Sequence, residues 1–324
     1  MSTKENILEL LEKNRGKSIS GEGIAAKLSI TRTAVWKAIN SLKQDGHEID
    51  AVPNKGYRLL NKSDVLSAYG ILNHLNSKID VSNIHVFNEV PSTNTIAKEL
   101  AQSGAKSGTI VITERQTAGR GRMGRSFISP SGGIYLSMIL RPRITVDKSI
   151  FYTVAACVGV CRAIEKISDK KPFIKWVNDI YIGGKKVCGI LTEAATDLES
   201  GSIEYIILGI GLNFATKKSL IPYEMADIMT SVYLDDTPPI TRNQMAANII
   251  DSVNEAILIN KSNEIIAEYR KKSFITGKKI VVLKGGDKRI ATALNITDDA
   301  RLRVQYEDGT LEELFSGEVS IIAK

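Results

Sequence analysis

The chain has 324 residues, 43% of them apolar and 24% charged, which is enough for two or three domains with a sizeable core. It carries a net charge of +7. The presence of only three cysteines and three histidines argues against a disulfide framework, a structural zinc site and a Ser-His-Asp triad. No apolar run is long enough to cross a bilayer, and charged residues interrupt the first segment where a signal peptide would be apolar. We therefore expect a cytoplasmic protein with no membrane partner.

The hydrophobic pattern of residues 1–62 predicts three helices followed by a hairpin. The helices are expected at 4–13, 21–28 and 32–43, and the strands at 48–52 and 57–60. Ser20 and Thr31 are the predicted N-caps of the second and third helices. This order is typical of a winged helix-turn-helix domain, with the helix-turn-helix running from Gly21 to Asn40.

The same segment contains eleven Lys and Arg against seven Asp and Glu, so it holds more than half of the net charge of the chain. This asymmetry indicates that the segment binds nucleic acid. The residues expected to contact DNA are Arg32, Thr33, Lys37 and Asn40 on the third helix and Lys55 at the hairpin tip. A basic helix face can also be merely solvated, and Trp36 could either pack under the hairpin or face the groove.

Residues 61–82 predict a connecting helix with polar breaks, followed by a strand at 83–90 and a helix at 95–103. Three small polar residues, Ser92, Thr93 and Asn94, precede that helix. Either they only cap it, or their hydroxyl and amide groups hold a polar, uncharged ligand group beside its N-terminus.

Between predicted strands at 109–113 and 134–140 lies a loop, residues 116–127, in which three glycines alternate with three arginines. The glycines allow a ligand to approach the backbone, and the guanidinium groups suit phosphate or carboxylate. We therefore expect an anion-binding loop that orders on its ligand, although a solvated hairpin tip has the same composition. Met123 and Arg125 are expected on its surface, available to a dimer partner. The loop matches the glycine spacing of the dinucleotide fingerprint, but a strand and not a helix follows it, so we reject that reading.

Residues 149–166 predict an apolar helix that buries Cys157 and Cys161. Residues 173–182 then read as one strand with charged residues at its centre, and buried charges must be paired or used. A Gly-Gly turn leads to a return strand at 185–193, which is expected to bring Asp179 close to Lys186.

A further strand at 203–212 carries Gly209 and Gly211, which leave room for a ligand. Helices are predicted at 241–262 and 264–272. Short strands follow at 279–284, 289–296, 301–306, 309–314 and 319–322, a pattern typical of a small SH3-like β-barrel. The predicted fold class is thus α+β multidomain: a winged helix-turn-helix domain at 1–62, a catalytic α/β domain at 63–274 and a barrel at 275–324.

Several motifs resemble those of biotin protein ligases in order and spacing. They are Ser92-Thr-Asn94, residues 116–125, Tyr135-Leu-Ser-Met138, Lys175-Trp-Val-Asn-Asp179, Lys186 with Gly189-Ile-Leu191, and Gly209-Ile-Gly-Leu-Asn213. Residues 315–320 are similar to the end of the barrel in that family. With its winged helix, the chain resembles the bifunctional class, in which one chain is both biotin ligase and biotin-operon repressor.

The resemblance implies a mixed central sheet of the class II synthetase type and an ATP-dependent, AMP-forming reaction. Biotin and Mg²⁺-bound ATP would give biotinoyl-5′-AMP, and the biotinoyl group would pass to a lysine of a biotin carboxyl carrier protein domain, such as that of acetyl-CoA carboxylase or another biotin-dependent carboxylase. It also implies a homodimer that forms when biotinoyl-5′-AMP is bound, and that represses biotin synthesis or transport genes by binding operator DNA.

The resemblance further implies roles for individual residues. The catalytic residues would be Lys186, Arg122 and Asp179, with Asp179 placing Mg²⁺ or the acceptor lysine. The biotin-binding residues would be Ser92, Thr93, Asn94, Gln116, Arg120, Gly121, Arg122, Lys186, Gly189 and Leu191. The adenylate-binding residues would be Arg120, Arg122, Phe127 and Asn213, with Phe127 at a position where the family usually has tryptophan.

Two other functions are compatible with the same chain. One is a transcription regulator that senses a small molecule without catalysis, and the other is a biotin ligase without specific DNA binding. The set of Arg122, Asp179 and Lys186 favours catalysis, because a sensor has no need of paired cations for phosphate transfer.

Overall fold

A computed structural model describes residues 2–197, 201–258, 262–284, 287–315 and 318–321. The chain forms two compact units, one of Met1–Val86 with Pro238–Asn248 and one of Phe87–Thr237 with Ile249–Lys324. The domain boundaries after residues 62 and 274 stay predictions. Among the described residues, no helix has both the length and the apolar character that crossing a membrane requires.

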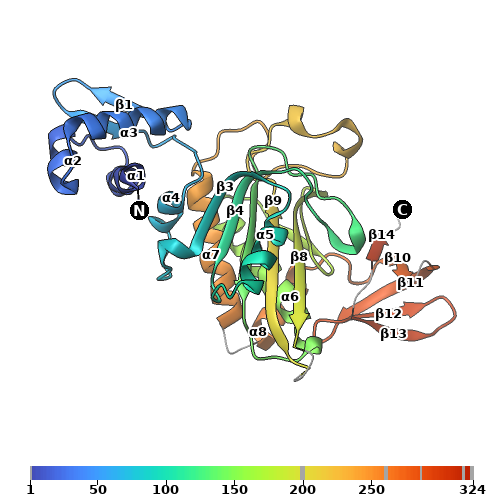
Figure 1. Ribbon diagram of the computed structural model, residues 1–324. Coiled ribbons are helices and arrows are strands. Elements are labelled where there is room, and N and C mark those ends of the chain that lie inside the picture. The colour runs from blue at the N-terminus through green and yellow to red at the C-terminus, as the bar shows by residue number, and fades with distance from the viewer. Residues whose placement is uncertain (1, 198–200, 259–261, 285–286, 316–317, 322–324) are drawn as a thin grey trace. The chain divides into compact units, whose positions relative to one another are not determined.

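The first unit begins with the predicted winged helix-turn-helix (Figure 1). Its elements are α1 (Thr3–Lys13), α2 (Gly21–Leu28), α3 (Arg32–Gln44), β1 (Ile49–Val52) and β2 (Gly56–Leu59). Both predicted caps are confirmed, because Ser20 accepts a hydrogen bond from the backbone of Gly23 and Thr31 accepts one from Ala34. The apolar faces of all three helices meet in one core, which leaves the opposite face of α3 to solvent.

The connecting segment is less helical than the sequence predicts. Only α4 (Ala68–Leu72) and the 3₁₀ turn η1 (Val81–Asn83) form within it. The residues before α4 are held by the start of α7 (Arg242–Leu258): Asp64 accepts hydrogen bonds from the backbone and side chain of Arg242, and Asn243 accepts one from the backbone of Ser67. These non-local bonds favour an extended path over the predicted helix.

The second unit is built on a central sheet. Within the described residues it has seven strands, in the order β3 (Ile84–Val90), β4 (Ile110–Gln116), β5 (Ile134–Leu140), β9 (Ile203–Leu212), β8 (Lys185–Thr196), β7 (Asp179–Ile182) and β6 (Phe173–Lys175). The strands at its centre are buried on both faces, which explains their continuous apolar runs.

Helices cover both faces of this sheet. On one face α5 (Thr93–Gln102) packs over Val111, Ile139, Tyr205 and Ile207. On the other face lies the buried helix α6 (Ile150–Ile167), backed by α8 (Ser262–Lys272). Because side chains alternate along a strand, Gly209 shares the face of Tyr205 and Ile207. Its lack of a side chain leaves room there for Asn94 in the first turn of α5, since a Cβ at Gly209 would lie 2.1 Å from Asn94 Oδ1.

The segment 173–182 differs from its prediction as a single strand. It forms two strands, β6 and β7, which pair with each other around a turn at residues 176–178. The Trp176 indole donates to the Ala300 carbonyl at 3.0 Å, and the Asn178 amide donates to the Ile190 carbonyl at 2.7 Å. Distant residues hold this turn, and no glycine or proline marks it locally.

The C-terminal region is an antiparallel sheet, as the short strands predict. Its strands are β10 (Lys279–Lys284), β11 (Asp287–Ile296), β12 (Leu302–Tyr306), β13 (Leu311–Leu314) and β14 (Glu318–Ile321), in the order β13-β12-β11-β10-β14. The strand pairings among the described residues do not close a ring, so the sheet is observed while closure of a barrel stays a prediction.

Candidate active site

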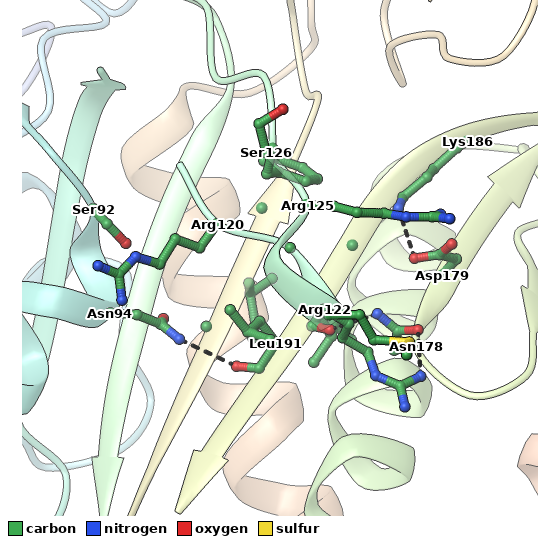
Figure 2. Close-up of a pocket in the computed structure, with 18 of the residues that line it drawn as sticks. Ser92, Asn94, Arg120, Arg122, Arg125, Ser126, Asn178, Asp179, Lys186 and Leu191 are labelled. Carbon is green, nitrogen blue, oxygen red and sulfur yellow. Dashed lines mark hydrogen bonds and ion pairs between the residues drawn. The ribbon is translucent and has the colours of Figure 1, made fainter. Parts of the chain in front are cut away.

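A pocket lies on the α5 face of the central sheet, where glycines leave the strands uncovered. Its floor includes Gly189 on β8 and Gly209 and Gly211 on β9. Gly189 and Gly211 are cross-strand partners, and Gly209 lies two residues before Gly211. The loop of residues 119–127 borders it (Figure 2). The structure therefore brings the two predicted glycine-rich stretches to one site.

The charge of the pocket is strongly unbalanced. Among the described residues that line it, five are cationic: Arg120, Arg122, Arg125, Lys175 and Lys186. The one carboxylate among them is Asp179. Such a surface attracts anions and can hold more than one negative group.

The predicted approach of Asp179 and Lys186 is confirmed. Lys186 Nζ lies 2.7 Å from Asp179 Oδ1, and both side chains are mostly buried (Figure 2). The contact lacks the alignment of a hydrogen bond, so Asp179 Oδ1 has no hydrogen-bond partner within the described ranges. The backbone of Lys186 is bonded on both sides, to Ile228 at 2.8 Å and Thr230 at 2.9 Å, which fixes where its side chain starts.

The glycine-arginine loop is a tight hairpin rather than the entry to a helix, in agreement with our rejection of the dinucleotide fingerprint. The Phe127 N–H donates to the Gly119 carbonyl at 2.8 Å, and a Cβ on Gly119 would lie 2.3 Å from the carbonyl oxygen of Phe127. Arg122, in the 3₁₀ turn η2 (Arg122–Gly124), reaches Asn178 at 3.4 Å. Met123 and Arg125 are both exposed, as predicted, and both also line the pocket. Their availability to a dimer partner stays a prediction.

The helix α5 begins at Thr93, two residues earlier than predicted, and Ser92, Thr93 and Asn94 at its start do more than cap it. Ser92 occupies the N-cap position, yet its side chain makes no capping bond. The Thr93 backbone and hydroxyl both donate to Gln116 Oε1, at 2.8 and 3.2 Å. Gln116 Nε2 in turn donates to the Ser129 hydroxyl at 2.8 Å. The side chains that line this end of the pocket are uncharged and are joined in a largely buried hydrogen-bond network.

Asn94 belongs to the same network. Its Nδ2 donates to Glu193 at 2.6 Å, and its Oδ1 accepts from the Ser137 hydroxyl at 2.6 Å. Ser129, Ser137 and Glu193 also belong to the site, although the sequence did not predict them there. Ser137 stands within a quoted motif, but only the pairing of β5 with β9 places it opposite Gly209.

Phe127 lies over two floor glycines. A Cβ at Gly211 would come within 2.4 Å of the Phe127 ring, and one at Gly189 within 2.9 Å. The Lys186 ammonium lies 5.8 Å from the centre of that ring. The aromatic side chain therefore stands beside the Lys186 ammonium, and its stacking on adenine stays a prediction.

The other predicted ligand residues divide into two groups. Arg120, Gly121 and Leu191 line the pocket with those already described. Asn213 does not: it is 2% exposed, and its amide donates to the Thr230 carbonyl at 3.1 Å. Its proposed contact with adenine stays a prediction.

The predicted DNA-binding residues lie mostly on one exposed surface. Arg32, Thr33 and Lys37 are exposed on α3, and Asn40 is half-buried. Lys55 is exposed at the hairpin tip. Trp36 is 57% exposed, so it does not pack under the hairpin. A large aromatic residue at the centre of a basic helix face is a candidate base contact.

The described residues support neither a metal-ligand cluster nor a reactive cysteine. No three His, Cys, Asp or Glu side chains within them cluster as metal ligands. Burial raises the pKa of the Cys157, Cys161 and Cys188 thiols, which keeps them protonated and unreactive.

Comparison with known proteins identifies the class. Residues 86–213 match the model of the biotin/lipoate A/B protein ligase family, and residues 3–58 match an HTH domain model. The bifunctional ligase/repressor BirA of Bacillus subtilis is 40% identical over 230 residues, which cover 71% of this chain and 70% of that protein. The chain belongs to the biotin/lipoate A/B protein ligase family.

Further relatives narrow the position of the chain within that family. The bifunctional ligase/repressor BirA of Escherichia coli is 29% identical over 316 residues, which cover 94% of each chain. The solved biotin protein ligase of Aquifex aeolicus, in complex with biotin and ATP, superposes with a TM-score of 0.63 at 26% identity, covering 75% of this chain and 99% of that one. The chain is a biotin protein ligase with an N-terminal helix-turn-helix domain, as the sequence motifs predict.

Proposed function

We propose that the protein converts biotin and ATP to biotinoyl-5′-AMP and pyrophosphate, and then transfers the biotinoyl group to a lysine of a biotin carboxyl carrier protein. The observation that carries this proposal is the pocket with five cationic side chains and one carboxylate among its described lining residues. The first step of the proposed reaction joins two anions, the biotin carboxylate and the α-phosphate of ATP, which repel each other in the absence of cations.

Lys186 is the principal electrostatic catalyst in this proposal. Its ammonium stands 2.7 Å from Asp179 and is held from a strand whose backbone is bonded on both sides. When the two anions enter, the ammonium can turn toward the carboxylate–phosphate junction, where negative charge accumulates. Arg120 and Arg122 supply further donors on the loop side.

Asp179 has two candidate roles once Lys186 turns toward the substrates. A single carboxylate oxygen without a hydrogen-bond partner among the described residues suits Mg²⁺, which keeps most of its waters and takes its other ligands from phosphates. Bound with ATP, Mg²⁺ would neutralise phosphate charge. In the second step the same carboxylate can attract and orient the ammonium of the acceptor lysine.

The neutral end of the pocket suits the ureido ring of biotin. Gln116 Oε1 already accepts two hydrogen bonds and one Nε2 hydrogen goes to Ser129, so the second Nε2 hydrogen remains for a ligand carbonyl. Ser92, Thr93 and Asn94 add short polar groups, while Gly189 and Leu191 line the apolar path toward the cations. A dithiolane ring such as that of lipoate would leave these buried groups unpaired, which favours biotin.

The second half of the proposal concerns DNA. We propose that biotinoyl-5′-AMP orders the loop of residues 116–127, that two chains then dimerise, and that their α3 helices bind two operator half-sites. The basic, exposed face of α3 and the bifunctional relatives support this function. Such a protein acts in the cytoplasm, where carrier protein, ATP and operator DNA meet.

Two assays separate this proposal from its alternatives. Biotin-dependent exchange of labelled pyrophosphate into ATP tests adenylation; biotin binding without exchange would leave only a sensor. Binding to operator sequences selected from a random duplex library, with and without biotin and ATP, tests repression. DNA binding that is absent at moderate salt, or indifferent to both substrates, would leave a ligase without specific DNA recognition.

A further inference from the structure

Behind the uncharged side chains at one end of the pocket lies an acidic residue, which does not line the pocket itself. Glu193 lies on β8 and accepts a hydrogen bond of 2.6 Å from Asn94 Nδ2. Asn94 does line the pocket and is 5% exposed. We propose that Glu193 is a positioning residue, which fixes the amide of Asn94 so that its oxygen, and not its nitrogen, is presented to the ligand.

The chemistry of three surrounding groups decides the orientation of this amide. The Glu193 carboxylate and the Leu191 carbonyl, 2.6 and 3.4 Å from Nδ2, can only accept hydrogen bonds. A reversed amide would place its oxygen against both of these oxygens, with no hydrogen between them. The Ser137 hydroxyl, on the other side, can donate to Oδ1 at 2.6 Å. The shorter, charge-assisted bond to Glu193 is therefore the strongest restraint on the amide.

The orientation determines what the pocket can recognise. Both hydrogens of Asn94 Nδ2 face β8, whereas Oδ1 has two lone pairs and the Ser137 hydroxyl takes at most one. The remaining lone pair requires an N–H or O–H group from the ligand. The absence of a side chain at Gly209 allows this oxygen to sit directly over the strand, since a Cβ there would lie 2.1 Å from it.

This inference rests on the proposed function, in which Asn94 contacts the ureido ring. A ureido ring has two N–H donors and one carbonyl acceptor. Asn94 Oδ1 supplies an acceptor and Gln116 Nε2 a donor, so the two side chains together match the ring only when the Asn94 amide has the orientation that Glu193 imposes. Glu193 thereby acts on specificity without touching the ligand.

The test compares Glu193→Ala, Glu193→Gln and the matched control Glu204→Ala in the full-length chain. Glu204 lies on the neighbouring strand β9, is exposed and pairs with Arg141 outside the pocket. Pyrophosphate exchange gives KM for biotin, KM for ATP and kcat, and calorimetry gives the Kd for biotin. Thermal unfolding reports whether each variant retains its fold.

We expect Glu193→Ala to raise KM and Kd for biotin roughly ten- to a hundredfold, because a charge-assisted hydrogen bond is lost. Both kcat and KM for ATP should change by less than about twofold, since the lost contact is made equally in ground and transition states. Glu193→Gln should raise KM and Kd for biotin by a smaller factor, roughly threefold or more, because the glutamine amide can donate to a reversed Asn94 amide. The control should match the wild type.

An unchanged biotin Kd in Glu193→Gln overturns the inference, even if Glu193→Ala fails to fold. So does an equal loss in kcat and in ATP affinity, which would indicate general disruption of the sheet. These outcomes are distinct from failure of the proposed function. If the wild type binds biotin without exchanging pyrophosphate, the catalytic proposal fails, whereas the calorimetric comparison still decides the role of Glu193.

Discussion

Substitution of Gly209 by alanine tests the geometry of the site with a single methyl group. The new Cβ would lie 2.1 Å from Asn94 Oδ1 and 2.9 Å from Asn94 Cγ. The backbone at this position does not have the positive φ that requires glycine, and alanine is otherwise the better strand residue. Any loss of function in this variant therefore arises from displacement of Asn94.

The size of the loss follows from the bonds that Asn94 must give up. To reach ordinary contact distance, the Asn94 amide has to move by about 1 Å, which breaks the 2.6 Å bond of Oδ1 to Ser137 and the 2.6 Å bond of Nδ2 to Glu193. A neutral hydrogen bond contributes about 1 kcal/mol and a charge-assisted one about 2 kcal/mol. Biotin binding loses at most this combined energy of about 3 kcal/mol, when the ligand needs Asn94 in its original place, which corresponds to binding up to roughly a hundredfold weaker.

Calorimetry of biotin binding and pyrophosphate exchange measure this loss, and Gly211→Ala serves as the matched comparison. Gly211 lies two residues further on the same strand face, where a Cβ would meet Phe127 at 2.4 Å instead of Asn94. We expect Gly209→Ala to impair mainly biotin binding and Gly211→Ala to impair mainly ATP binding. Equal biotin affinity in wild type and Gly209→Ala would refute the placement of Asn94 in the biotin site.

Three further predictions concern other parts of the chain. Lys186→Met should slow adenylation at least about a hundredfold in single-turnover assays while changing the biotin Kd far less; equal losses in both would contradict its role as electrostatic catalyst. Burial lowers the pKa of His47 from 6.5 to about 4. The unfolded chain therefore binds this proton more readily, so stability of the winged helix is complete above about pH 6.5 and falls by about 2 kcal/mol between pH 7 and pH 5. Hydrogen exchange of α1–α3 should detect this loss in the wild type and a smaller one in His47→Leu; identical pH profiles would contradict it. Trp36→Ala should weaken binding to selected operator DNA roughly tenfold or more, and binding to unrelated DNA much less, in titrations at fixed salt; equal weakening would leave Trp36 without a role in base recognition.

Local signals predicted the first unit and the short C-terminal strands well. The caps Ser20 and Thr31 act through residues three positions away, so their effect is visible in the sequence. The apolar stripe of α3 likewise repeats with the period of a helix. Segments whose conformation depends on distant partners were predicted less well. The turn at Trp176 is held by Ala300, and the extended path at Asp64 is held by Arg242.

The candidate site shows the same division. The cationic residues and glycines stand in short motifs, and the hairpin that pairs Asp179 with Lys186 is local enough to predict. Ser137 and Glu193 come from different strands, and each meets Asn94 only through strand register. Neither residue shows a ligand site in its local sequence until β5, β8 and β9 are placed side by side.

The reaction proposed for this pocket is the joining of biotin to AMP. Exchange of labelled pyrophosphate into ATP, with biotin and lipoate tested side by side, measures that reaction most directly. We expect exchange that depends on biotin and is negligible with lipoate, because only the ureido ring pairs with Asn94 and Gln116. Exchange that is equally fast with lipoate, or absent with biotin although biotin binds, would contradict the account.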